Sequence, residues 1–349
     1  MATVAFTGLL LGVLLAHAEE DLPDIPDPVG RAGMMAAVLV DADGREVILA
    51  AGGANFPDAP PWSGGVKVFH RDIYLLEERD RRWGWRKVGD LPAPCAYAAW
   101  CAAPDRKRLI VAGGAAGDRH NDAVWAVAID GTVEPFAAAM PQPRAYGGCG
   151  VVGDTLVVLG GSRSAADTAA LPTLVRLSLT EPERGWVEAA GDPSRARIVP
   201  LLGVFGDSVV WGGGCSLTAV EGRPRRVYRD DLHRDDLDSG AGAMLQRLES
   251  PFAGAAGPGV ACRGGLLFVG GDDGSRGGVA TADHPGQSRR VLCIDPETGR
   301  VTDVGRWPTP LATAPLLRLG DDLVTISGES RPGVRTPAVS RWPIPEHLR

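Results

Sequence analysis

The sequence predicts an all-β fold made of six repeated four-stranded units, and three observations support this. First, a short apolar run ending in a glycine doublet or its near relative recurs six times, at residues 47–53, 109–114, 156–161, 209–213, 266–271 and 323–328. Second, these runs recur about every 50 residues, which is the period of kelch-type propeller blades. Third, the 47 glycines and 28 prolines punctuate the apolar runs and do not form one low-complexity block. The predicted fold class is therefore a six-bladed kelch-type β-propeller.

Each apolar run fits a buried strand near the centre of its blade, because a strand that is covered on both faces is apolar throughout. The glycine doublet then lets the backbone bend sharply where neighbouring sheets crowd together. Propellers bind ligands over their central channel, so the loops that enter and leave these inner strands are the expected location of the functional site.

The expected elements follow the repeat. The first blade takes its four strands from residues 34–40, 46–53, 66–77 and 85–90. The next four blades cover about residues 97–140, 145–190, 198–248 and 258–304, and the sixth begins near residue 314. In the fourth blade, the charged stretch at residues 223–238 is expected to be an exposed excursion or a part of the channel rim.

Ring closure is predicted at the N-terminus. The third strand of the sixth blade, at residues 337–342, leaves no room for a fourth strand after it. Residues 22–26 resemble the endings of outer strands such as Asp90-Leu91-Pro92, so we expect the N-terminal segment to supply the missing strand and remove an open edge. Prolines in this segment suit an outermost strand.

A leader is predicted at residues 1–18. Its apolar core of roughly a dozen residues is too short to span a bilayer and fits a signal peptide. Ala16-His17-Ala18 supplies a cleavage site, so the mature protein is expected to begin at Glu19 and to form one propeller over residues 19–349. We expect a soluble periplasmic or secreted protein without a membrane anchor.

The charge and the cysteines exclude some classes of protein. The net charge is −7, from 36 basic and 43 acidic residues, and no basic block occurs, so nucleic acid is not an expected partner. The six cysteines lack the CxxC or CxxxH spacing of zinc sites, so no metal is expected.

The sharpest candidate for chemistry is the loop at residues 327–336, where Glu329 and Arg335 flank a Pro-Gly turn. A guanidinium can bind a carboxylate through two hydrogen bonds, and a neighbouring glutamate can move protons as a general acid or base. The alternative is a structural ion pair that holds the loop together.

Further candidate substrate contacts are Asn55, Phe56, His70, Arg144 and Tyr146. An asparagine can both donate to and accept from sugar hydroxyls, and an aromatic ring can stack on a sugar ring. Four of them have a structural alternative: a turn asparagine followed by a core aromatic for Asn55 and Phe56, blade packing for Arg144, and a solvated loop for His70.

Three stretches resemble the cyclically permuted mutarotase family of kelch propellers: residues 52–57, 61–74 and 328–336. The resemblance extends over roughly residues 21–342. The family's catalytic Glu and Arg lie in a Gly-Glu-x-x-Pro-Gly-x-Arg-Thr loop, which maps onto Glu329 and Arg335. The chain departs from the family at Cys95, where an Arg commonly precedes Ala-Tyr, and at Pro315 and Leu316, where small residues are usual.

This resemblance implies an isomerase that interconverts the anomers of N-acetylneuraminate or a related acidic sugar, with no cofactor. Glu329 is expected to shuttle the proton and Arg335 to hold the sugar carboxylate. The alternative is a non-catalytic propeller that binds glycans or proteins. A copper radical oxidase would need two His and two Tyr ligands, and the sequence offers no defensible set of these.

Overall fold

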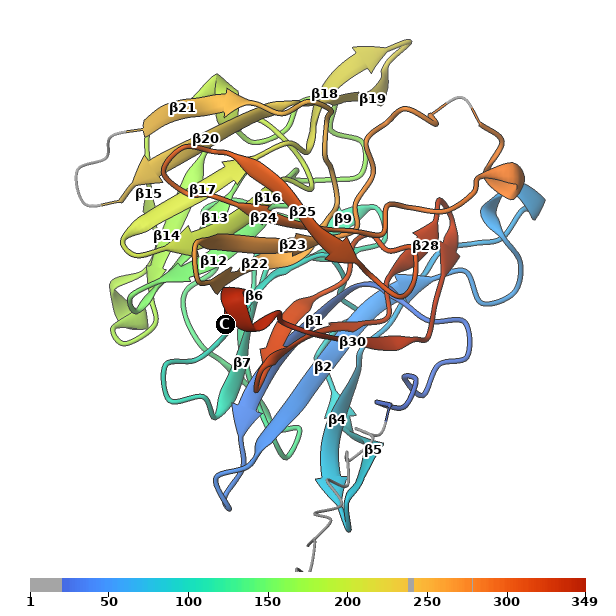
Figure 1. Cartoon of the computed structure of the whole chain (residues 1–349), viewed down its shortest axis with the longest axis vertical. Helices are drawn as coiled ribbons and strands as arrows, with labels where there is room; N and C mark the ends of the chain where they lie inside the picture. Colours follow the sequence, from blue (N-terminus) through green and yellow to red (C-terminus); the bar gives the residue numbers. More distant parts are fainter. Residues whose placement is uncertain (1–20, 238–241, 278) are drawn as a thin grey trace, which may run out of the picture.

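The computed structural model describes residues 21–349 except 238–241 and 278, so the signal peptide predicted at residues 1–18 lies outside the described residues. The described residues form β-strands and short 3₁₀ turns and contain no α-helix (Figure 1). The turns are η1 (Pro61–Ser63), η2 (Pro182–Arg184), η3 (Pro193–Arg195), η4 (Thr281–Asp283) and η5 (Glu346–Leu348). The prediction of an all-β propeller fold is confirmed.

The first three large sheets are antiparallel and follow one another along the chain. The first sheet contains β1 (Ala32–Val40), β2 (Glu46–Asn55), β4 (Asp72–Arg79) and β5 (Arg82–Asp90), with β3 (Val68–Phe69) beside β2. The second contains β6 (Ala99–Ala102), β7 (Arg108–Ala112), β10 (Val124–Ala128) and β11 (Val133–Pro135). The third contains β12 (Gly148–Val152), β13 (Thr155–Leu159), β14 (Leu174–Ser178) and β15 (Val187–Glu188).

The second half of the chain forms an eight-stranded and a three-stranded sheet. The eight-stranded sheet consists of two four-stranded meanders joined by a single parallel bridge between Gly203 and Gly259. Its strands are β16 (Leu201–Phe205), β17 (Ser208–Gly212), β20 (Asp231–Asp236) and β21 (Gly242–Arg247), followed by β22 (Ala256–Cys262), β23 (Gly265–Val269), β24 (Arg290–Ile294) and β25 (Val301–Arg306). The three-stranded sheet contains β26 (Leu316–Leu319), β27 (Asp322–Ile326) and β30 (Val339–Pro343).

Three small hairpins lie between the strands of these sheets. They are β8 (Ala115–Ala116) with β9 (Arg119–His120), β18 (Cys215–Val220) with β19 (Arg223–Tyr228), and β28 (Glu329–Arg331) with β29 (Val334–Arg335). The hairpin of β18 and β19 extends outward from the body of the protein (Figure 1).

The apolar runs of the sequence are the second strands of these meanders, as predicted. They are β2, β7, β13, β17, β23 and β27, and almost every residue in them is buried. Strands lie on both sides of each run within its own sheet, and the faces pack against neighbouring sheets. Full burial therefore requires apolar side chains on both faces.

Backbone hydrogen bonds between the units form a closed cycle. In each unit, one residue at the start of the first strand or just before it donates its N–H to the carbonyl of the equivalent residue in the preceding unit, at 2.7–2.9 Å. The residues follow the order Gly33, Tyr97, Tyr146, Val199, Gly254, Thr313 and back to Gly33. All six residues have a left-handed backbone, with φ between 45° and 65°. The first strands also contact one another in turn, from β1 through β6, β12, β16 and β22 to β26, and β26 contacts β1.

The glycine doublets hold neighbouring units together. The second doublet glycine donates its N–H to a carbonyl of the following unit, for example Gly271 to Leu311 at 2.7 Å. In the fourth unit Gly214 makes this bond, because Gly213 donates to Asp231 within its own unit. Gly270, the first glycine of its doublet, has no room for a side chain, since a Cβ there would lie 2.0 Å from the Leu311 carbonyl oxygen and φ is +72°. The doublets therefore fix the distance between adjacent sheets.

The predicted N-terminal strand does not form. Residues 21–31 contain no strand, although Leu22 and Ile25 are buried. A single backbone bond, from Ile25 N to Pro337 O at 3.0 Å, joins the segment to the chain that leads into β30. The prolines explain the difference, because Pro23 and Pro26 have no N–H to donate to a ladder.

The charged stretch at residues 223–238 is only partly an exposed excursion. Its first part is β19, whose residues are largely exposed. Its second part is β20, which lies inside the fourth meander and carries the buried Asp231 and Asp235. Strand β20 is difficult to predict from sequence, because charged residues are usually solvent-exposed unless buried partners neutralise them.

Candidate functional site

A cavity of about 350 Å³ lies against the cycle of backbone hydrogen bonds. Tyr97, Tyr146, Val199, Gly254 and Thr313 belong both to the cycle and to the cavity lining. These five residues also line a smaller, inner cavity of about 100 Å³. The cycle therefore forms the floor of the larger cavity. The charged residues of that cavity are Lys67, Arg226, Asp272, Arg276, Glu329 and Arg335.

Glu329 and Arg335 line this cavity and lie directly opposite each other in the hairpin of β28 and β29. The Pro332-Gly333 turn between them places Gly333 at φ +79°, a conformation that favours glycine. Oε2 of Glu329 lies 2.8 Å from Nη1 of Arg335. The sequence therefore identified two residues that the fold brings together at the cavity.

The Arg335 guanidinium is buried and held in place. It lies over the Phe56 ring, with 5.1 Å between Cζ and the ring centroid, and its Nε donates to the Ala54 carbonyl at 3.4 Å. Its Nη1 is within ion-pair distance of Glu329 but has no aligned hydrogen-bond acceptor among the described residues. Nη1 is itself fully buried, so Arg335 contributes its positive charge to the cavity that it lines, balanced in part by Glu329. Phe56 supports Arg335 and is not part of the cavity lining.

Tyr146 pairs with Tyr97 on the floor of the cavity. Their ring centroids are 4.5 Å apart at an interplanar angle of 31°. Burial raises the pKa of both phenols, so both hydroxyls stay protonated at neutral pH and can donate hydrogen bonds. Tyr146 was a predicted site residue, whereas Tyr97 was not, because Cys95 interrupts the Arg-Ala-Tyr pattern that marks Tyr146.

Lys67 is a cavity residue that the sequence did not single out. Its Nζ lies 4.6 Å from the centroid of the Tyr97 ring and 5.1 Å from that of Phe69. Burial lowers the pKa of Lys67, and its interaction with Tyr146 acts in the opposite direction. Its position in the Gly-Gly-Val-Lys stretch carried no signal of its own, since a lone lysine in a loop is usually solvated.

Asn55 and His70 do not line the cavity. Asn55 is 1% exposed, and its amide donates to Asp27 Oδ2 at 3.1 Å and to the Gly30 carbonyl at 2.9 Å. Its Oδ1 lies 2.8 Å from His70 Nε2. The structure thus brings the two residues together inside a polar network that anchors the N-terminal segment. This geometry favours the structural alternative over sugar contact.

Arg144 is also buried in the framework. It is 2% exposed, and its guanidinium donates to the Gly160 carbonyl and, at 2.8 Å, to Thr173 Oγ1. The structure therefore favours blade packing for Arg144, the alternative weighed against sugar binding.

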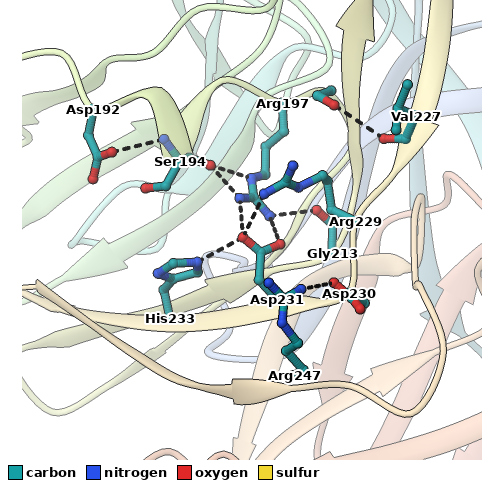
Figure 2. Close-up of polar contacts among 11 residues, drawn as sticks. Asp192, Ser194, Arg197, Gly213, Val227, Arg229, Asp230, Asp231, His233 and Arg247 are labelled. Carbon is teal, nitrogen blue, oxygen red and sulfur yellow. Dashed lines mark hydrogen bonds and ion pairs between the residues drawn. The ribbon is translucent and has the colours of Figure 1, made fainter.

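Arg197 is a buried framework arginine like Arg144, and it pairs in addition with the carboxylate of Asp231 (Figure 2). The two form a bidentate ion pair, with both N···O distances 2.9 Å, and both are almost fully buried. Nε2 of His233 lies 2.9 Å from Asp231 Oδ2, and its ring stacks on Trp211 at a centroid distance of 4.2 Å. Burial would raise the pKa of Asp231, but hydrogen bonds from His233 and Arg197 lower it far below its usual range.

This cluster lies outside the cavity lining, so we assign it to the framework. Within the described part of the chain, no group of three or more His, Cys, Asp and Glu side chains has the arrangement of a metal site. No helix in that part is long and apolar enough to cross a membrane.

Comparison with known proteins supports the resemblance to the mutarotase family. No family model matches the chain. A 123-residue stretch is 29% identical to the N-acetylneuraminate epimerase of Haemophilus influenzae (strain PittEE). This match covers 32% of the present chain and spans 31% of the length of that relative. A solved structure, described as the structure of YjhT, aligns with 94% of this chain and 99% of its own at a TM-score of 0.66 and 15% identity. That likeness shows a shared fold.

Proposed function

We propose that this protein is a sugar mutarotase, an isomerase that interconverts the anomers of N-acetylneuraminate or a related acidic sugar. The observation that carries the proposal is the Glu329–Arg335 ion pair in a polar cavity that both residues line. The partial match to a curated N-acetylneuraminate epimerase supports the choice of sugar.

Ring opening of such a sugar needs a base at the anomeric hydroxyl and an acid at the ring oxygen. Glu329 takes the anomeric proton as the C–O bond of the ring breaks and a ketone forms. Arg335 holds the sugar carboxylate with its positive charge and balances the charge that develops beside it. Rotation about the adjacent bond and reclosure on the other face return each proton to its source.

The size of the expected effect is modest. Mutarotation already proceeds in water, and positioned acid–base groups typically accelerate such a step about 10²–10⁴-fold. The proposed reaction therefore requires only positioned acid–base groups in the cavity and a cation that recognises the carboxylate.

Anomer-resolved NMR of freshly dissolved N-acetylneuraminate tests this function. The protein is expected to shorten the equilibration of the two anomers in proportion to its concentration, beyond the rate in buffer. A control with N-acetylmannosamine, which lacks the carboxylate, is expected to show little acceleration. Binding of N-acetylneuraminate without any change in the exchange rate would favour a non-catalytic glycan-binding propeller instead.

The finer fold assignment belongs to the same proposal. We propose six blades in one ring, since the backbone cycle links six equivalent residues and β26 contacts β1.

We also propose export, with cleavage after Ala18 and a periplasmic or secreted location. Finding Met1 or Ala2 at the N-terminus of the native protein would contradict export.

A further inference from the structure

The proposed mutarotase step needs two proton-transfer groups, and Glu329 supplies one of them. The acid that protonates the ring oxygen has to reach the bound sugar from another part of the cavity. Arg335 cannot serve, because a guanidinium does not release its proton in the pH range of proteins. The second group therefore has to come from the remaining polar residues of the lining.

Two pairs of interacting residues remain in the lining. Tyr228 donates its hydroxyl proton to Asp272, and burial together with Asp272 raises the pKa of Tyr228, so this proton is not offered to the cavity. Lys67 and Tyr146 form the other pair. Both line the same cavity as Glu329. The Lys67 ammonium is held between the Phe69 and Tyr97 rings and interacts with the Tyr146 hydroxyl. The structure shows no ion pair between Lys67 and a carboxylate among the described residues. The Lys67 ammonium therefore contacts the aromatic rings of the cavity floor and is not neutralised by a structural carboxylate.

The position of Tyr146 is fixed by the backbone. It stands in the cycle of hydrogen bonds with φ +62°, and its ring packs on Tyr97 and, at 5.6 Å, on His120. Non-glycine residues in this conformation are energetically unfavourable and are concentrated at functional sites. The hydroxyl is thus presented to the cavity by a residue whose main chain has little freedom.

We propose that Tyr146 is the second catalytic residue, protonating the ring oxygen, and that Lys67 is a positioning residue that resupplies its proton. This inference rests on the proposed mutarotase function. It assigns the acid half of the reaction to the floor of the cavity and the base half to Glu329 in the hairpin of β28 and β29.

The transfers balance without any external reactant. During opening, the anomeric O–H proton moves to Glu329, the bond between the anomeric carbon and the ring oxygen breaks, and the ring oxygen takes the Tyr146 proton. Lys67 passes a proton to the Tyr146 oxygen and becomes a neutral amine. On reclosure the new hydroxyl returns its proton through Tyr146 to Lys67, and Glu329 gives its proton to the carbonyl oxygen.

The environment of Lys67 favours this role. Burial lowers its pKa, the nearby Arg335 lowers it further, and Tyr146 and Glu329 act in the opposite direction. Tyr97 faces the ammonium through its ring, and His120 lies close enough to interact electrostatically. An ammonium with a lowered pKa is a better proton donor near neutral pH than an ordinary lysine. The acid has to be protonated, so activity is expected to fall as the pH rises through the pKa of Lys67.

Steady-state anomer exchange over a range of pH tests the proposal with Lys67→Met, Lys67→Arg and Tyr146→Phe. Lys67→Met is expected to lower kcat about 10²-fold, with KM near wild type, and to remove the alkaline decline of the pH profile. Lys67→Arg is expected not to restore kcat, since it keeps the charge but donates no proton. Tyr146→Phe keeps the ring packing and is expected to lower kcat similarly. Lys107→Met, at an exposed position, is the matched control.

The outcomes separate this inference from the function on which it rests. If wild-type protein does not accelerate exchange, the mutarotase function and this inference are both wrong. If wild-type protein is active but Lys67→Met raises KM and leaves kcat unchanged, Lys67 only recognises the sugar carboxylate and the acid assignment is overturned. Recovery of full kcat in Lys67→Arg, with all variants folded by circular dichroism, would overturn it as well.

Discussion

The backbone N–H of Gly328 donates to the carbonyl oxygen of Arg31 at 2.8 Å, joining residues near the two ends of the chain. Ser327 stands before Gly328, where the other five units have a glycine, and its φ is +56°. The Ser327 hydroxyl accepts from the Arg31 N–H at 2.7 Å and donates to the Thr336 carbonyl at 2.6 Å. This junction therefore has side-chain bonds that the other doublets lack.

Ser327→Ala is expected to destabilise the protein by about 1–3 kcal/mol, because the Arg31 N–H and the Thr336 carbonyl then lose a buried partner. Urea unfolding measures the change. Ser340→Ala serves as a buried-serine control, since its hydroxyl has only a 3.5 Å contact to Thr309. Equal losses in the two variants would show that the junction has no special role.

Glu329→Gln is expected to abolish accelerated anomer exchange while leaving sugar binding largely intact, since the amide cannot take up a proton. A loss of about 10²–10⁴-fold is expected. NMR exchange rates and calorimetric binding measure the two effects, with the exposed Glu297→Gln as control. A lowered melting temperature with normal turnover per folded molecule would instead indicate a structural ion pair.

Arg335→Lys is expected to weaken the binding of a carboxylated sugar about tenfold or more. An ammonium cannot reproduce the fork of N–H donors, and one charge-assisted hydrogen bond contributes about 1.5–3 kcal/mol. Calorimetry with N-acetylneuraminate and with its methyl ester compares charged and uncharged ligands. Equal weakening for both ligands would contradict recognition of the carboxylate by Arg335.

Gly270→Ala is expected to destabilise the protein more than Gly264→Ala. Both glycines have a left-handed backbone, but a Cβ on Gly264 meets open space, whereas one on Gly270 meets the Leu311 carbonyl. The backbone term is about 1–2 kcal/mol in both. The clash adds about 1–3 kcal/mol at Gly270 alone. Denaturant unfolding of the pair isolates the clash, and equal losses would argue against close packing of the units at this doublet.

Asp231→Asn is expected to cost about 3–5 kcal/mol, because the buried Arg197 guanidinium loses its charged partner. The pKa of Asp231 is lowered in the folded state, so its contribution is present above the usual pKa of about 4 and is lost as the pH falls below it. Unfolding free energies measured from pH 7 to pH 3 are expected to fall less steeply in the variant. Asp303→Asn, in a more exposed pair, is the control, with an effect below about 1 kcal/mol.

Repeated features were predictable from the sequence. The apolar runs and their glycines located the second strands, because burial on both faces and close backbone approach each restrict the residue type. The Pro-Gly turn between Glu329 and Arg335 predicted their proximity for a similar local reason. Local chain geometry was sufficient for these assignments.

Contacts between distant segments were not predictable in the same way. Asn55 and His70 are polar loop residues in the sequence, and only the fold shows that they bind each other. Lys67 reaches the cavity because Tyr97 and Tyr146, from two other units, provide the surface beneath it. A single sequence does not show which distant residues contact each other. The structure was therefore needed to assign Asn55 to the framework and Lys67 to the cavity.

The floor of the cavity has a consequence for how such a protein can change its ligand. The cycle that holds the floor together uses only main-chain N–H and carbonyl groups, so it can persist with different side chains at its six positions, except at Gly33, where a Cβ would lie 2.4 Å from the Tyr97 ring. Here they carry two tyrosines, a valine, a threonine and two glycines. Substitution at these positions can therefore alter the polarity and depth of the binding surface while the hydrogen bonds beneath it persist, which separates the evolution of specificity from the maintenance of the scaffold.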